Sequence, residues 1–121
     1  AILLISHDMG VLARMCDRIS VMYLGKIVEE SNADTLYASP KHPYTQALLK
    51  AVPIPDPSKK GQFSLLKGDL PGSVDIPSGC RFRDRCPEAF DKCAGEEPMI
   101  KETNKNGSRV ACWLYNLDRI I

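Results

Sequence analysis

The chain has 121 residues, with 16 lysines and arginines against 15 aspartates and glutamates, so its formal net charge is only +1. This balance leaves no field strong enough to hold nucleic acid or an anionic membrane by electrostatics alone. No apolar run approaches the roughly 20 residues that span a bilayer, and no leader pattern is present, so we expect a soluble chain. Its length leaves room for one modest domain, or for the tail of a domain followed by a small module.

The first expected element is a buried strand. Residues 1–5 form the apolar run Ala-Ile-Leu-Leu-Ile, without a start methionine or a polar lead-in. Such a run is typical of a strand covered on both faces, as in a parallel sheet flanked by helices. We therefore expect a cut end, with the rest of that sheet missing.

A helix and a hairpin should follow. Apolar residues recur at one-sided helical spacing over residues 9–18. The next two runs, 19–24 and 26–30, are rich in residues that favour strands and are joined by Gly25. This pattern predicts a β-hairpin.

Two short helices are expected after the hairpin. Asn32 or Asp34 can cap the first one, which should run through Tyr37, because a side-chain oxygen accepts the free N–H groups of a first turn. Pro43 suits the start of the second, where its missing N–H does no harm, and good helix formers continue to Ala51.

A proline-rich stretch marks the clearest boundary in the chain. We predict an α/β domain remnant over residues 1–52, a linker over 53–61 and a cysteine-containing extension over 62–121. The remnant would comprise a strand, a helix, a hairpin and two short helices.

The extension should be a small, loop-rich module with a β-hairpin of its own. Residues 62–66 fit an edge strand, and residues 68–79 are rich in glycine and proline and should be loop. The runs 99–102 and 109–114 flank Asn106-Gly107, which is a strong hairpin signal.

Four cysteines carry the strongest chemical signal. They are Cys80, Cys86, Cys93 and Cys112, with the spacing C-x5-C-x6-C-x18-C. The predicted hairpin should bring the third and fourth together. Cys16 stands apart and is expected to be a small apolar residue on the first helix.

Four kinds of cysteine site remain open: an iron–sulfur cluster, a structural zinc site, two disulfides, or reduced packing residues. Disulfides are disfavoured in a reducing compartment. Zinc ligand pairs typically lie two to four residues apart, which the first two gaps do not match. A cubane is bulkier than one ion, so its thiolates can come from well-separated points. The adjacent charged run, residues 81–85, is expected to form a solvated face.

The first thirty residues resemble the end of the ATP-binding domain of ABC transporters. The resemblance rests on the strand before Ser6-His7-Asp8, on Asp17-Arg18-Ile19 and on residues 21–29. It implies that His7 is the switch histidine, which contacts the γ-phosphate of ATP in the intact protein. An imidazole at a strand end can bond a phosphate oxygen. Taken alone, such a histidine is more often structural or solvated.

Residues 39–53 resemble the His-Pro-Tyr segment of the branch of ABC importers that carries peptides and nickel. The matching stretch reads Ser-Pro-Lys-His-Pro-Tyr-Thr-Gln-Ala-Leu-Leu-Lys-Ala-Val-Pro. We interpret His42 and Tyr44 as structural residues that pack and hydrogen-bond at a helix entrance.

The cysteine region resembles the same importers, which carry a Gly-Cys-x-Phe-x-x-Arg-Cys-Pro pattern, a third cysteine and a final Val-x-Cys. The matching residues are Gly79, Cys80, Phe82, Arg85, Cys86, Pro87, Cys93, Val110 and Cys112. The resemblance implies a [4Fe–4S] cluster on the four cysteines, with zinc on the same residues as the alternative. Ser108 and Trp113 occupy positions where the family often has histidine.

These resemblances imply the C-terminal part of the ATP-hydrolysing subunit of a bacterial oligopeptide or dipeptide ABC importer. The chain contains no G-x-x-x-x-G-K-[ST] loop and no ABC signature, so we expect no catalysis by this fragment alone. ATP and magnesium would be bound only by the intact protein. The implied partners are a paired ATP-binding subunit and membrane-spanning subunits, on the cytoplasmic face of the cell membrane.

An alternative function is an autonomous zinc or iron–sulfur interaction module unrelated to nucleotide, in which His7 is simply part of the core. Independently of function, a strand without neighbours exposes an apolar edge, and such edges recruit partners. We therefore expect the fragment to self-associate through residues 1–31, and we expect no nucleic acid partner.

Overall fold

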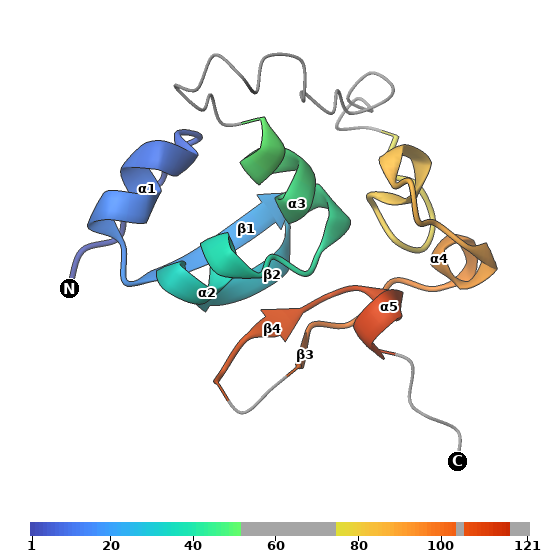
Figure 1. Ribbon diagram of the computed structural model, residues 1–121. Helices are drawn as coiled ribbons and strands as arrows, with labels where there is room; N and C mark the ends of the chain where they lie inside the picture. Colours follow the sequence, from blue (N-terminus) through green and yellow to red (C-terminus); the bar gives the residue numbers. More distant parts are fainter. Residues whose placement is uncertain (52–74, 104–105, 117–121) are drawn as a thin grey trace, which may run out of the picture.

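The structure is a computed structural model that describes residues 1–51, 75–103 and 106–116. Its centre is a four-stranded antiparallel sheet in the order β1-β2-β4-β3 (Figure 1). The strands are β1 (Arg18–Tyr23), β2 (Lys26–Asn32), β3 (Lys101–Glu102) and β4 (Arg109–Val110). The mixed α/β class expected from the sequence is confirmed, and the sheet consists of two hairpins joined side by side.

The join between the hairpins connects the two halves of the chain. In the antiparallel pairing of β2 with β4, Glu29 lies opposite Val110 and Glu30 lies opposite Arg109. Just beyond β4, the Ala111 N–H donates a hydrogen bond to the Val28 carbonyl at 2.8 Å. The predicted C-terminal hairpin therefore forms, and it extends the sheet begun by the N-terminal one.

The β1–β2 hairpin forms where the sequence predicts it. Side chains of β1 are alternately exposed and buried, with Ile19, Val21 and Tyr23 facing inward. The connecting residues Leu24 and Gly25 both have positive φ, 46° and 79°. Two-residue loops with this backbone match the twist of the flanking strands.

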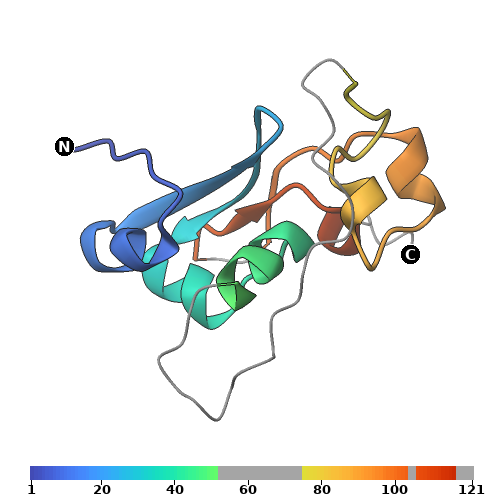
Figure 2. The same ribbon diagram turned by 90° about the horizontal axis from the view of Figure 1, so that it is seen from above.

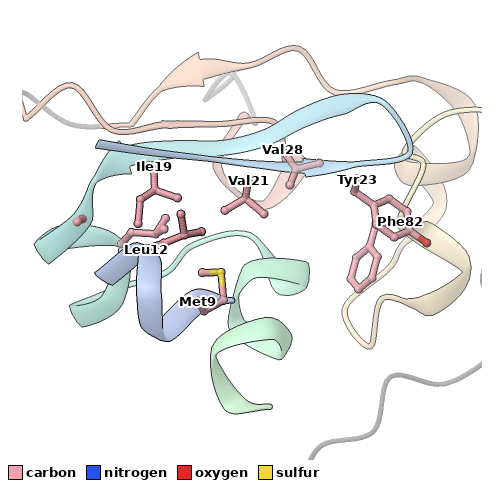
Figure 3. Packing of buried hydrophobic residues seen from close by; sticks show 9 residues of the cluster. Met9, Leu12, Ile19, Val21, Tyr23, Val28 and Phe82 are labelled. Carbon is pink, nitrogen blue, oxygen red and sulfur yellow. The ribbon is translucent and has the colours of Figure 1, made fainter. Parts of the chain in front are cut away.

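Three helices cover one face of this hairpin (Figures 1 and 3). They are α1 (Met9–Met15), α2 (Ala33–Ala38) and α3 (Pro43–Lys50). Of the two expected cap candidates, Asn32 and Asp34, it is Asn32 that caps α2, by accepting the Thr35 N–H at 2.8 Å. Pro43 opens α3, as expected. Helix α1 ends at Met15, before the expected Arg18, because Arg18 already belongs to β1.

The opening strand predicted for residues 1–5 is wrong. Residues 1–6 are neither strand nor helix, and Ile2, Leu3 and Ile5 are 96%, 90% and 89% exposed. A parallel strand is held by hydrogen bonds to neighbours on its edges. Within the described ranges no strand lies beside residues 1–6, so the apolar run has nothing to pair with.

The core lies between the sheet and the helices. Ile19, Val21 and Tyr23 point from β1 toward the side occupied by Met9 and Leu12 of α1 (Figure 3). At the far end of the hairpin, Phe82 meets Tyr23 and is only 1% exposed. Phe82 comes from the cysteine region, so that region contributes to the same core.

The remaining described residues of the extension form short turns and helices. They are the 3-10 helix η2 (Arg83–Arg85), α4 (Asp91–Gly95) and α5 (Trp113–Asn116). The predicted strand run 109–114 is interrupted, because the chain turns into α5 after Cys112, with the Asn116 N–H bonded to the Cys112 carbonyl. The predicted linker 53–61 and edge strand 62–66 lie outside the described residues, so the proposed domain division remains a prediction. None of the described helices is long and apolar enough to cross a membrane.

Candidate functional site

The four cysteines of the extension come from three local structures. Cys80 precedes η2, Cys86 follows it, Cys93 lies within α4, and Cys112 follows β4. The Cys80 N–H donates a hydrogen bond to the Cys93 carbonyl at 2.8 Å. The other three thiols each act electrostatically on Cys112, and Cys80 and Cys93 act on Cys86. The structure therefore brings the four thiols into one neighbourhood, including the third and fourth.

Burial dominates the acid–base behaviour of these thiols. It raises the pKa of Cys80 and of Cys86 above the ordinary value, with smaller contributions from neighbouring thiols. Burial, reinforced by the other three thiols, raises the pKa of Cys112 to about 12. The Cys80, Cys86 and Cys112 thiols are consequently protonated at neutral pH in the metal-free protein, and a metal that binds them has to release these protons.

The side-chain arrangement bears on two of the alternatives that the sequence leaves open, disulfides and a zinc site. All five cysteines, which all lie in the described residues, are free rather than disulfide-bonded. Among residues 1–51, 75–103 and 106–116, no group of three or more His, Cys, Asp or Glu side chains is placed to hold one metal ion. The thiols are gathered, but not in the tight grouping that a single ion such as zinc requires.

The His-Pro-Tyr segment is held by a buried glutamate. Glu29, 2% exposed on β2, accepts the backbone N–H groups of Lys41 and His42 through its two oxygens, both at 2.8 Å. The Nδ1 atom of His42 accepts the Tyr44 N–H at 3.0 Å and thereby caps α3. Burial lowers the pKa of His42 to about 4, so its imidazole is neutral. The structural role expected for His42 is confirmed.

An aromatic cluster joins this segment to the cysteines. The Phe82 ring lies 5.2 Å from the Tyr23 ring, 5.4 Å from the Tyr44 ring and 5.7 Å from the His42 ring, between centroids. Tyr23 and Tyr44 are 4.8 Å apart. Phe82 stands between Cys80 and Cys86 in the sequence, so packing of this ring fixes the backbone that carries both thiols.

The charged run beside the cysteines is not the solvated face that its composition suggests. The Arg81 side chain is only 20% exposed; it donates to the Leu24 carbonyl at 2.5 Å and pairs with Glu97. Arg83 donates to the Ala94 carbonyl at 3.1 Å. These two arginines bind backbone carbonyls of the hairpin turn and of α4, which a local reading of the sequence could not show.

His7 lies apart from the cysteines. It is exposed in the segment before α1, whose first turn is capped by the Asp8 side chain. Helix α1 and helix α4 lie at opposite ends of the molecule in both views (Figures 1 and 2). The two sets of site residues predicted from the sequence therefore form separate regions.

Comparison with known families decides the relationship. A model of the family described as the C-terminal region of oligopeptide/dipeptide transporters matches residues 28–93, more than half of the chain. The chain belongs to this family. The matched stretch runs from β2 to α4 and includes the Glu29 carboxylate, the His-Pro-Tyr segment and three of the four cysteines; His7 and Cys112 lie outside it.

Individual relatives of this oligopeptide/dipeptide transporter region extend the match. A putative peptide import ATP-binding protein of Brucella ovis is 48% identical over 115 residues, covering 95% of this chain and 36% of the relative. In Bacillus subtilis, the putative oligopeptide transport ATP-binding protein YkfD is 50% identical, covering 93% and 35%. The oligopeptide transport ATP-binding protein AppD is 44% identical, covering 95% and 34%. The chain spans about a third of the length of these relatives.

Glu29 is the residue of this transporter region that the sequence analysis missed. A glutamate in a strand is ordinarily expected to face solvent. One signal was present, however, because successive side chains of a strand point to opposite faces. Of the adjacent pair Glu29 and Glu30, one had to point toward the helices.

Proposed function

We propose that the chain is the C-terminal part of the ATP-hydrolysing subunit of an ABC transporter that imports peptides. The observation that carries the proposal is the family match together with relatives named as peptide import ATP-binding proteins that align over nearly the whole chain. Because the chain spans only about a third of those relatives, hydrolysis, substrate and partners belong to the intact protein. The alternative, an autonomous metal-binding module, does not account for a match that begins in β2 and continues through α3.

In this proposal His7 is the residue of the chain that faces nucleotide. Its side chain is exposed, and the adjacent Asp8 fixes the local backbone by accepting the Val11 N–H at 3.1 Å. An imidazole held in this way can bond a γ-phosphate oxygen and orient the attacking water. ATP and magnesium would be held by other parts of the intact subunit. That subunit would pair with a second ATP-binding subunit and bind the membrane-spanning subunits at the cytoplasmic face of the membrane.

The test uses the full-length gene product assembled in its transporter. His7→Ala is expected to lower ATP turnover about 100-fold or more while nucleotide affinity changes little, because the lost contact acts on the transferred phosphate. Arg14→Ala, an exposed change on α1, is the control and should keep wild-type turnover. Wild-type turnover in His7→Ala would overturn the role given to this histidine.

For the extension, we propose that Cys80, Cys86, Cys93 and Cys112 hold a [4Fe–4S] cluster. The support is the hydrogen bond that joins the backbones of Cys80 and Cys93, the contributions of the other three thiols to the raised pKa of Cys112, and the origin of the four thiols on either side of η2, in α4 and after β4. A cubane offers four iron atoms, so its thiolates stand farther apart than the ligands of one ion. When bound, the cluster would supply a reducible group of negative charge that joins η2, α4 and the end of β4.

Anaerobic purification tests the cluster. The protein should be brown and contain about four iron and four acid-labile sulfide per chain. Cys112→Ser is expected to lose at least about half of the iron, since a hydroxyl is a poorer ligand than a thiolate, whereas Cys16→Ser should keep it. Colourless protein with one zinc per chain and no iron would refute the cluster.

We also propose that a separated chain self-associates through residues 1–31. The exposed side chains of Ile2, Leu3 and Ile5 form an apolar surface for such contact. Light scattering at high concentration should show a dimer or larger species, and a monomer would contradict the proposal.

A further inference from the structure

In the cysteine region, the backbone at Gly79 lies close against the end of α4. Its φ is +71°, a backbone conformation that residues other than glycine rarely adopt. A Cβ placed there would lie 2.2 Å from the carbonyl oxygen of Cys93 and 2.9 Å from the carbonyl carbon and oxygen of Ala94. All three atoms are backbone, so none can swing aside. Only glycine allows segment 78–80 to lie this close to α4.

The same contact orients two of the four thiol-bearing residues. The carbonyl of Cys93 accepts the Cys80 N–H at 2.8 Å. The carbonyls of the last helical turn have no partner within their own helix, and they need one from outside. Cys80 supplies that partner, so the end of α4 and the start of the 80–86 loop are joined through the backbones of two cysteines.

Two side chains bind the next carbonyl of α4, that of Ala94. The Ser78 hydroxyl donates to the Ala94 carbonyl at 3.3 Å, and Arg83 Nη1 donates to the same oxygen at 3.1 Å. Arg83 also donates to the Ser78 hydroxyl at 3.2 Å. The Cys93 and Ala94 carbonyls at the end of α4 are thus both bound by residues 78–83.

We propose that Gly79, together with Arg83, is a positioning residue of the four-cysteine site. The contact holds the backbone of Cys80 against that of Cys93 before any metal is present. A methyl group at residue 79 has to withdraw by about 1 Å to reach ordinary contact with the Cys93 oxygen. A displacement of that size moves the Cys80 thiol out of register with the other three. This inference rests on the cluster proposed above and concerns the residues that prepare its site.

The first measurement compares Gly79→Ala with Gly95→Ala in anaerobically purified protein. Gly95 is the matched control, because within the described residues nothing lies within 4 Å of a Cβ built there and its φ is not in the left-handed region. Gly79→Ala should lose at least half of its iron and sulfide, and a chelator should remove the remainder about tenfold faster. Gly95→Ala should match the wild type in both respects.

The second measurement needs no cluster. In metal-free protein with Cys16, Cys86 and Cys112 changed to serine, dibromobimane becomes fluorescent when it bridges the two remaining thiols, Cys80 and Cys93. We expect Gly79→Ala to slow bridging about tenfold, while alkylation of single thiols by iodoacetamide is unchanged. Arg83→Gln, which keeps the glycine, should slow bridging to a smaller extent, and Arg83→Lys should restore part of the rate. Arg83→Gln also provides a result if Gly79→Ala does not fold.

The outcomes separate the two proposals. Equal bridging rates in the Gly79→Ala, Arg83→Gln and Gly95→Ala proteins would overturn the positioning role, even if the wild type binds iron. Slower bridging in Gly79→Ala and in Arg83→Gln, combined with a wild type that binds no iron, would uphold the positioning role and refute the cluster.

Discussion

Replacing Phe82 by alanine is expected to lower the free energy of unfolding by about 3–5 kcal/mol. The ring is 1% exposed and packs against the rings of Tyr23, Tyr44 and His42. Removing it deletes the buried area of an aromatic side chain and leaves a cavity that three other rings cannot fill without losing their own contacts. Denaturant unfolding followed by tryptophan fluorescence, with Trp113 as the reporter, measures the change.

Phe90→Ala is the matched control for this experiment. Phe90 is 39% exposed at the residue before α4, so its truncation should cost less than about 1 kcal/mol. Phe82→Leu should fall between the two, because leucine restores part of the lost volume. Similar losses in Phe82→Ala and Phe90→Ala would show that the aromatic cluster does not hold the two halves of the chain together.

Replacing Glu29 by glutamine is expected to cost about 2–4 kcal/mol of unfolding free energy, because hydrogen bonds to a charged group each contribute roughly 1.5–3 kcal/mol. The carboxylate is 2% exposed and accepts the N–H groups of Lys41 and His42. Glutamine keeps one acceptor oxygen but points an amide donor at the second N–H. One buried backbone donor is then left unsatisfied, and the entrance to α3 loosens.

Glu30→Gln provides the control on the same strand. Glu30 pairs with Arg18 at 2.6 Å, with side chains 18% and 48% exposed, and its hydrogen bond from Arg18 is the main cause of its lowered pKa. Such a partly solvated pair contributes at most about 1 kcal/mol and weakens with salt. Denaturation with and without 1 M sodium chloride should show a small, salt-sensitive loss for Glu30→Gln and a large, salt-insensitive one for Glu29→Gln. Equal losses would mean that the Glu29 contacts do not stabilise α3.

Glu29 and Phe82 both contact residues at the start of α3. Glu29 holds the backbone before α3, and Phe82 packs against the rings of His42 and Tyr44 at the start of the same helix. Phe82 stands between Cys80 and Cys86 in the sequence, so the cysteine region and the start of α3 share one packed aromatic cluster.

Several elements could be predicted from short stretches of sequence. The β1–β2 hairpin needed only its β-rich runs and Gly25. The start of α3 needed only Pro43, and the start of α2 was narrowed to a cap by Asn32 or Asp34. In each case the side chain acts on its own backbone or on residues three or four positions away. The four cysteines were recognisable as a candidate site for a different reason. Cysteine is rare enough that four in one region are informative.

Contacts between distant residues had to come from the tertiary structure. The run at residues 1–5 has the composition of a buried strand, but a strand forms only when a neighbour supplies its hydrogen bonds. Phe82 lies in a turn-rich segment, and nothing nearby shows that its ring completes a core built from β1 and α3. Glu29 looks like a solvated strand residue until the backbone of Lys41 and His42 is placed over it.

The sequence by itself determined the hairpin, the two capped helices, the family resemblance and the identity of the four thiols. The tertiary structure decided that β4 lies beside β2 and that Glu29 and Phe82 contact the His-Pro-Tyr segment. It also decided that the backbone at Gly79 lies close against α4, which only a glycine permits. The physical reason is range. Capping and turn formation depend on backbone groups a few residues apart, whereas strand pairing, ring packing and backbone contact depend on surfaces that meet only when the whole chain has folded.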